Sequence, residues 1–348
     1  MNSLGLSLIL KMGCICSKET ITINSRKYTV REHLGEGGFS TVLLVEDTIT
    51  HKKYAIKKII CHGLEDQRLA AKEIEYYNLV KHPNIIECID STYKGTADPI
   101  ANATSEVLIV LPYYHRGTLA NELERRAKNK DYMSALDILN IFLQICEGVK
   151  AFHETTPEPL AHRDLKTANI VLDDGNTPIL MDLGSVAPAR VKICGSQAAQ
   201  TLQDLAAERC SMPYKAPELF NVESYCMVDE RTDIWSLGCI LYALCYFKSP
   251  FDAVYERGDS VALAVMSANI TFPEDAPYTE SVKASQITFY IIICVQFVSN
   301  FIYVCVCVCV YIYIYIYIYI YIYIYIYTHT HTHTHTHTHT EIKFLLLF

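Results

Sequence analysis

The chain has 348 residues, of which 51% are hydrophobic and 20% charged, and its formal net charge is -8. This composition fits a globular chain with room for one two-lobed domain or two small ones. Beyond residue 286 the only charged side chains are Glu341 and Lys343, so the earlier part carries the whole negative charge. That acidic balance argues against a nucleic-acid partner. Fourteen cysteines without regular spacing predict reduced thiols rather than a disulfide framework.

The first informative motif is MGCICS at residues 12–17, which fits the N-myristoylation pattern if Met12 is the initiator. One myristoyl chain on Gly13 gives only marginal membrane binding, and Cys14 and Cys16 supply adjacent palmitoylation sites. The motif therefore predicts attachment to a membrane surface through N-terminal acyl groups. An incidental match is the alternative, and a start at Met1 predicts a cytoplasmic protein instead.

A glycine cluster follows within an alternating apolar and polar pattern from Tyr28 to Val45, which predicts two antiparallel strands joined by a loop. Glycines in such a loop let backbone N–H groups approach the phosphates of a nucleotide, and a valine just beyond them covers the adenine. A glycine-rich hairpin alone is more often only a turn. The candidate nucleotide-binding residues of the loop are Leu34, Gly35, Glu36, Gly37, Gly38, Phe39, Ser40, Thr41 and Val42.

The next segment, Tyr54-Ala55-Ile56-Lys57, is typical of a third strand that ends in a lysine for the α- and β-phosphates, with Ala55 also beside the nucleotide. Residues 69–80 are compatible with a helix that precedes the breaker sequence His-Pro-Asn. Glu73 lies in this stretch. A glutamate on a helix is usually solvated surface, but the spacing favours an ion pair between Glu73 and Lys57.

A β-rich run at residues 107–110 ends at Leu111-Pro112-Tyr113-Tyr114, where we expect a hinge between two lobes. Pro112 has no N–H, but its carbonyl can accept from the adenine amine while the N–H of Tyr114 donates to the ring. Leu111 then lies behind the adenine as the gatekeeper residue. The alternative is an ordinary loop between a strand and a helix.

The strongest signal is HRDLKTAN at residues 162–169, followed thirteen residues after its Asn by Asp182-Leu183-Gly184. Phosphoryl transfer needs a carboxylate that accepts the hydroxyl proton, a lysine near the moving phosphate, and an amide and a second carboxylate that hold Mg²⁺. Asp164, Lys166, Asn169 and Asp182 stand in that order and spacing. The sequence therefore predicts a protein kinase that uses ATP and Mg²⁺. Thr167 replaces the usual proline of this loop.

The segment from Asp182 to Glu218 is typical of a kinase activation segment. Its residues 197–209 are rich in Ala, Gln, Leu and Glu with helical apolar spacing, which predicts a helix where many kinases have an open loop. Ser211 and Lys166 favour serine and threonine over tyrosine as acceptors. The predicted partners are therefore proteins that carry serine or threonine hydroxyls. Asp233 begins a helix expected to brace the catalytic loop.

With these motifs assembled, residues 12 to about 286 resemble the Numb-associated kinase family. The resemblance implies an α+β, two-lobed fold and a constitutively competent serine/threonine kinase that autophosphorylates. It also implies lipid anchorage on the cytosolic face of Golgi membranes and a link to secretory traffic. The stretches that carry the likeness are 12–14, 34–40, 61–62, 116–119, 181–185, 201–204, 229–239 and 258–265.

The predicted domains are an N-terminal extension at 1–27, a kinase domain at 28–286 and a tail at 287–348. Within the kinase domain the small lobe spans 28–111, the hinge 112–114 and an incomplete large lobe 115–286. The tail alternates Val-Cys, then Tyr-Ile, then Thr-His, as translated dinucleotide repeats do, so we do not expect a native domain there.

The resemblance also implies that the last large-lobe helices and the arginine partner of Glu218 are missing. A truncated, catalytically weak scaffold is therefore the main alternative to an active enzyme. A third reading is an integral membrane protein that uses residues 287–327, an uncharged stretch longer than a membrane-spanning helix requires.

Overall fold

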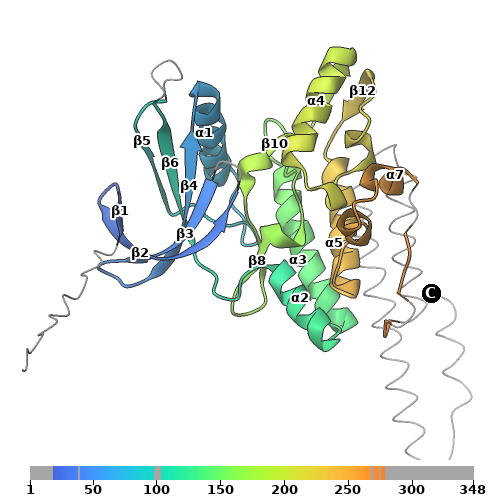
Figure 1. The fold of residues 1–348 in the computed structure, drawn as a ribbon, viewed down its shortest axis with the longest axis horizontal. Coiled ribbons are helices and arrows are strands. Elements are labelled where there is room, and N and C mark those ends of the chain that lie inside the picture. The colour runs from blue at the N-terminus through green and yellow to red at the C-terminus, as the bar shows by residue number, and fades with distance from the viewer. Residues whose placement is uncertain (1–18, 38–39, 98–102, 268–269, 274–275, 279–348) are drawn as a thin grey trace, which may run out of the picture.

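In the computed structural model an antiparallel sheet with one long helix forms one lobe, and a group of helices forms the other (Figure 1). The structure describes residues 19–37, 40–97, 103–267, 270–273 and 276–278. This arrangement confirms the predicted α+β class. The acylation residues Gly13, Cys14 and Cys16, the loop residues Gly38 and Phe39, and the tail at 287–348 lie outside the described residues.

The small lobe is built on a six-stranded sheet in the order β1-β2-β3-β4-β6-β5. Its strands are β1 (Thr20–Ile23), β2 (Arg26–Glu36), β3 (Ser40–Asp47), β4 (Lys53–Cys61), β5 (Asp90–Lys94) and β6 (Ser105–Pro112). Strand β1 pairs with Arg26–Thr29 of β2, so the sheet includes residues that the sequence-based division put in the N-terminal extension. The sheet of the small lobe therefore extends to Thr20, ahead of the predicted domain start at residue 28.

One helix, α1 (Leu64–Leu79), packs on this sheet and starts five residues before the predicted helix. Glu65 and Asp66 in its first turn favour this earlier start, because carboxylates stabilise the positive end of the helix dipole. The helix buries Ala70, Glu73, Ile74 and Tyr77. Residues 107–111 of β6 are buried as well, since this central strand is covered on both faces.

The large lobe is organised around α3 (Ala135–His153) and α5 (Arg231–Tyr246). Every residue of α5 from Thr232 to Tyr246 is buried, including the polar Thr232, Asp233 and Ser236, so the helix is covered on all sides at the centre of the lobe. Around them lie α2 (Leu119–Asn129), α4 (Ser196–Arg209), α6 (Asp252–Glu256) and α7 (Val261–Met266). Among the described helices, none has both the length and the hydropathy that crossing a bilayer requires.

Three short ribbons connect these helices to the loops that carry polar motifs. They are β7 (Leu160–Ala161) with β10 (Ala187–Pro188), β8 (Ile170–Leu172) with β9 (Pro178–Leu180), and β11 (Val191–Cys194) with β12 (Tyr225–Val228). The β8–β9 ribbon follows the catalytic motif directly and leads to Asp182. The sheet bridge between Ile85 and Leu180 ties this ribbon to the segment after α1.

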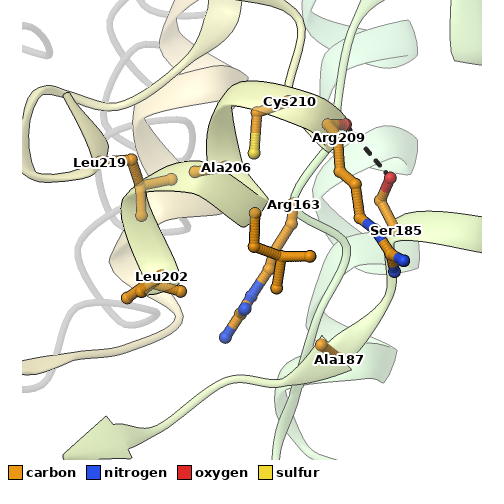
Figure 2. A pocket seen from close by; sticks show the side chains of 9 residues that line it. Arg163, Ser185, Ala187, Leu202, Ala206, Arg209, Cys210 and Leu219 are labelled. Atoms are coloured by element: carbon orange, nitrogen blue, oxygen red, sulfur yellow. Dashed lines mark hydrogen bonds between the residues drawn. The ribbon is translucent and has the colours of Figure 1, made fainter. Parts of the chain in front are cut away.

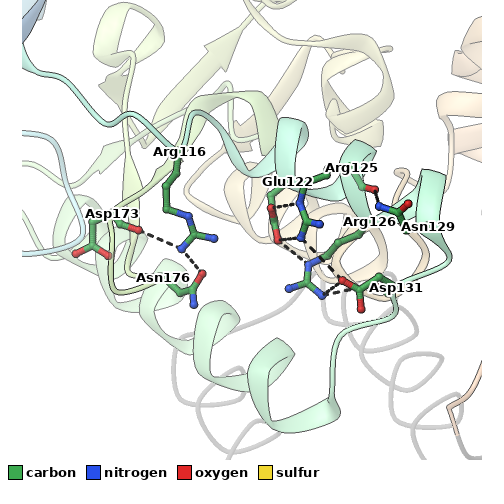
Figure 3. Close-up of polar contacts among 8 residues, drawn as sticks. All are labelled: Arg116, Glu122, Arg125, Arg126, Asn129, Asp131, Asp173 and Asn176. Carbon is green, nitrogen blue, oxygen red and sulfur yellow. Dashed lines mark hydrogen bonds and ion pairs between the residues drawn. The ribbon is translucent and has the colours of Figure 1, made fainter.

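Polar contacts surround α2 and the residues just before it, where the chain enters the large lobe (Figure 3). Thr118 caps the helix in a reciprocal box with Asn121. Arg116 donates to the carbonyl of Asp173 at 3.3 Å and to the side chain of Asn176. These bonds join the predicted hinge exit to the turn between β8 and β9.

Candidate active site

Lys57 lies between two carboxylates, which come from distant parts of the chain, and forms an ion pair with each. It is at the middle of β4, where it pairs with Val42 of β3 and Ile109 of β6. Its Nζ is 2.8 Å from Oε1 of Glu73 on α1 and 2.7 Å from Oδ1 of Asp182. The predicted pair of Lys57 and Glu73 is thus present in the structure, and it includes the carboxylate predicted to bind metal.

Burial and neighbouring charges have opposite effects on the pKa values of these three side chains. The side chains of Lys57, Glu73 and Asp182 are 13%, 4% and 39% exposed. Desolvation lowers the pKa of the Lys57 ammonium, but the two carboxylates outweigh it and raise that pKa overall. Desolvation likewise raises the pKa of Glu73, whereas for Asp182 the Lys57 charge prevails and lowers the pKa. Asp182, the more exposed carboxylate, therefore stays ionised.

Gly184 leaves room for the cluster because it has no side chain. A Cβ there would lie 3.2 Å from Oε2 of Glu73, 3.5 Å from Oδ1 of Asp182 and 3.6 Å from Nζ of Lys57. Asp182 itself has a φ of 62°, a left-handed conformation that costs a non-glycine residue energy. The Asp-Leu-Gly motif is thus held in a shape that brings its carboxylate to Lys57.

The catalytic-loop motif places Asp164 at the centre of a second polar group. One carboxylate oxygen accepts from the backbone N–H of Ser211 at 2.9 Å. The other accepts from the Asn169 amide at 2.9 Å and lies 3.0 Å from Nζ of Lys166. Lys166 also donates to the Ser211 hydroxyl at 2.7 Å. The structure therefore brings the predicted base, lysine and hydroxyl together.

Asp233 supports the backbone of this loop by accepting hydrogen bonds from two of its N–H groups. It is fully buried on α5 and accepts from the N–H of His162 at 2.7 Å, the N–H of Arg163 at 2.8 Å and the His153 ring at 2.9 Å. Burial alone would raise the pKa of Asp233, but these partners lower it. Arg163 has a φ of 64°, so this brace holds a strained peptide in place.

Asn169 and Asp182 have the donor chemistry that Mg²⁺ requires. Asn169 uses its amide N–H groups on the backbone carbonyl and the side chain of Asp164, both at 2.9 Å. This fixes the amide so that its oxygen is the atom left for a ligand. Hard cations prefer such amide and carboxylate oxygens. With the ionised Asp182, the pair fits a magnesium ion that keeps several water ligands.

The predicted nucleotide-binding residues come together on neighbouring strands. Gly35 pairs with Val42 across the β2–β3 hairpin, and Ala55 pairs with Leu111 across β4 and β6. Gly37 and Ser40 exchange backbone hydrogen bonds of 2.7 and 3.4 Å, which close the tip of the hairpin. The flanking residues Leu34, Glu36 and Thr41 belong to these strands, and Pro112 and Tyr114 follow Leu111.

The structure adds contacts that motif reasoning did not identify. The Tyr77 hydroxyl donates to Oε1 of Glu73 at 3.3 Å from one turn further along α1. A spacing of four on a helix could have suggested this pair. Thr167 contacts Tyr214 through their hydroxyls, 47 residues apart. No local pattern could have predicted that contact.

The predicted activation-segment helix is present as α4 and covers a small cavity beside the catalytic loop (Figure 2). The cavity measures about 30 Å³ and is lined by Leu202, Ala206, Cys210 and Arg163 among others. Arg163 donates to the carbonyl of Pro188, and Ser185 donates to the carbonyl of Arg209 at 3.2 Å. Burial raises the pKa of Cys210 to about 12, so its thiol stays protonated and unreactive.

Sequence comparison gives an independent result. Residues 28–300 match the family profile of the protein kinase domain. The chain is 43% identical over 270 residues to serine/threonine-protein kinase 16 of Rattus norvegicus and 42% identical to that of Homo sapiens; each alignment covers 78% of this chain and 86% of the relative. It is 30% identical over 292 residues to serine/threonine-protein kinase ppk13 of Schizosaccharomyces pombe, which covers 75% of this chain and 84% of the relative.

Proposed function

This chain belongs to the protein kinase family and is a serine/threonine kinase, and from that premise we propose which residues perform the transfer of the γ-phosphoryl group of ATP to a protein hydroxyl. The observation that supports this best is the meeting of Lys57, Glu73 and Asp182 at 2.8 and 2.7 Å from three separate elements. Such a cluster positions a nucleotide because phosphate binding needs a fixed cation and a metal ligand.

Asp164 accepts the proton of the acceptor hydroxyl as that oxygen bonds to the γ-phosphorus, while the bond from this phosphorus to the β–γ bridging oxygen breaks and ADP leaves with its electron pair. Its carboxylate is oriented by Asn169 and by the N–H of Ser211. Lys57 and Lys166 neutralise negative charge on the phosphates, and Glu73 holds Lys57 in place. Asn169 and Asp182 hold Mg²⁺, which when bound neutralises charge on the phosphate oxygens. The adenine binds between Ala55, Val42 and the segment from Pro112 to Tyr114.

A phosphate-transfer assay tests this assignment. The purified chain is incubated with radiolabelled ATP and magnesium, with casein as acceptor, and compared with Asp164→Ala. Asp174→Ala is the matched control, because Asp174 is 83% exposed and pairs only with His115 at the surface. We expect Asp164→Ala to lose at least about 10²-fold in rate and the control to keep it. Equal incorporation by wild type and Asp164→Ala would favour the non-catalytic scaffold.

We further propose that the chain belongs to the Numb-associated kinase family and autophosphorylates. The motif resemblance and the helical activation segment α4 support this. The test is incubation with labelled ATP in the absence of any acceptor, followed by peptide mapping. Label that appears in wild type and not in Asp164→Ala supports the proposal, and an unlabelled wild type that still phosphorylates casein contradicts it.

The proposed location is the cytosolic face of Golgi membranes, with a role in secretory traffic, through myristoyl on Gly13 and palmitoyl on Cys14 and Cys16. The residue pattern at 12–17 supports it. Alkaline carbonate extraction of wild type, Gly13→Ala and the Cys14→Ser, Cys16→Ser double variant tests it. We expect only wild type in the Golgi membrane pellet. A double variant that stays in the pellet would instead favour a span at residues 287–327.

We also propose that the large lobe is incomplete and marginally stable as encoded. Burial raises the pKa of the Glu218 carboxyl, and the Arg231 guanidinium offsets only part of that effect. Among the described residues, the buried indole N–H of Trp235 also has no acceptor, and an unsatisfied buried donor costs about 1–3 kcal/mol. Thermal denaturation and the transfer assay, both on a purified fragment of residues 12–286, test this. A sharp, cooperative transition together with full activity would refute the proposal.

A further inference from the structure

The hydroxyls of Thr167 and Tyr214 meet at 3.2 Å in the interior, and both residues are buried. Thr167 is the residue of the catalytic loop that departs from the proline expected there. Proline has neither a hydroxyl nor an N–H, so it could make no such bond to Tyr214. This contact is therefore specific to the residue that this chain carries.

Tyr214 lies within a short segment, Ser211–Ala216, that we call the acceptor loop. At its start, Ser211 is fixed to the catalytic loop by its N–H on Asp164 and its hydroxyl on Lys166, at 2.9 and 2.7 Å. At Tyr214 the backbone carbonyl accepts from Ser236 of α5 at 2.8 Å. Among the described residues, Thr167 links the Tyr214 phenol to the catalytic loop, through its hydroxyl at 3.2 Å and also through its backbone.

The two anchors enclose the part of the acceptor loop that can touch another chain. Met212 is 39% exposed, while Pro213, Tyr214, Lys215 and Ala216 are buried. If the loop tilts about Ser211, Met212 shifts relative to the Asp164 carboxylate. A bond at Tyr214 prevents that tilt, because it fixes the loop at a second point three residues away.

We propose that Thr167 is a positioning residue that, through Tyr214, holds the acceptor loop in the geometry that binds protein substrate. This inference rests on the proposed roles of Asp164 and Lys166, to which the other end of the loop is tied. It places the effect of Thr167 on acceptor binding and not on nucleotide binding, because neither hydroxyl contacts Lys57, Glu73 or Asp182. A merely structural bond would change stability without this selectivity.

The test is steady-state kinetics of the full chain. In one series the casein concentration is varied at saturating magnesium-ATP, and in the other the ATP concentration is varied at saturating casein. The variants are Thr167→Val, Tyr214→Phe, their combination, and Thr167→Ser, which restores the hydroxyl. Thr201→Val is the matched control, since the Thr201 hydroxyl bonds only within α4, to the carbonyl of Gln197 at 2.9 Å. Thr167→Pro adds a fold-compatible variant: Lys166 before it is already extended, as a residue preceding proline must be.

We expect Thr167→Val and Tyr214→Phe each to raise KM for casein about fivefold, the factor for one hydrogen bond of about 1 kcal/mol, with KM for ATP unchanged. The double variant should be no worse than Tyr214→Phe alone, because Tyr214→Phe already removes the phenol oxygen that Thr167 contacts. Thr167→Ser should match wild type and Thr167→Pro should resemble Thr167→Val or exceed it.

Three results would overturn the inference: unchanged KM for casein in Thr167→Val, additive effects in the double variant, or an equal rise in KM for ATP. A wild type that transfers no more phosphate than Asp164→Ala overturns the proposed catalytic roles instead. The two failures are thus distinguishable. Unfolding midpoints of all variants, measured in parallel, separate lost binding from lost folding.

Discussion

Replacement of Asp233 by Asn should remove the support of the catalytic loop while keeping side-chain size. Asp233 is 0% exposed and accepts three hydrogen bonds, from the N–H groups of His162 and Arg163 and from the His153 ring. An asparagine offers one acceptor oxygen and one NH₂ group. Whichever way it turns, the NH₂ meets a donor, so at least one buried N–H of the loop loses its acceptor.

The magnitude follows from these contacts. Hydrogen bonds to a charged group contribute about 1.5–3 kcal/mol each, and an unsatisfied buried donor costs about 1–3 kcal/mol. Losing one such bond and weakening the other two should lower the free energy of unfolding by about 3–5 kcal/mol. Domains of this kind have about 5–15 kcal/mol in total. When the NH₂ group takes the place of Oδ1, the bond lost is that from the N–H of Arg163, whose φ of 64° is strained.

Urea denaturation at pH 7 measures this effect, and the chain supplies its own probe. Its single tryptophan, Trp235, lies two residues after Asp233 in α5, so its fluorescence reports the same region. Asp259→Asn is the control, because Asp259 is 57% exposed and pairs with the exposed Arg257. Surface pairs of this kind contribute about 1 kcal/mol or less.

The same experiment has a pH dependence with a definite sign. Because the folded-state pKa of Asp233 is lowered, its contribution is present above the unfolded pKa of about 3.9 and is lost as pH falls through the folded value. The difference between wild type and Asp233→Asn should therefore be full at pH 7 and shrink below about pH 4. A variant as stable as the Asp259→Asn control at pH 7 would refute the reasoning.

Three further predictions concern single side chains. Lys57→Met should cut the transfer rate at least about 10²-fold and destabilise the protein by about 3 kcal/mol, because it leaves Glu73 buried without a cation. The control Lys58→Met loses a surface pair with Glu106 and should change neither the rate in transfer assays nor the stability in thermal melts. Gly184→Ala should lower kcat about tenfold with a small change in melting temperature, because its Cβ would displace the Glu73 carboxylate that holds Lys57 by tenths of an ångström. A wild-type kcat would contradict this. Glu122→Gln should cost about 1 kcal/mol at pH 7 in urea titrations and progressively less as pH falls from about 4 toward 2, because Arg125 and Arg126 lower the Glu122 pKa to about 2. A cost that does not decrease over this range would point to packing instead.

Local patterns were sufficient for most of the elements. The alternation from Tyr28 to Val45 predicted the β2–β3 hairpin, and the helical spacing at 197–209 predicted α4. These predictions succeed because an element buries one face, and burial imposes its period on the sequence. The match to the protein kinase domain begins at residue 28, as the predicted domain does, while Thr20–Ile23 before it forms a short edge strand that pairs with β2.

The amino-acid sequence by itself determined the chemistry: Asp164, Lys166, Asn169 and Asp182 stand in a spacing that phosphoryl transfer requires, since one loop and one turn must present them together. Only the tertiary structure decided which of these groups contact each other, at what distance, and through which neighbours. The bond from Thr167 to Tyr214 and the cluster around Gly184 join residues far apart in the chain. Such contacts depend on how the lobes pack, and packing leaves no periodic trace in a single sequence.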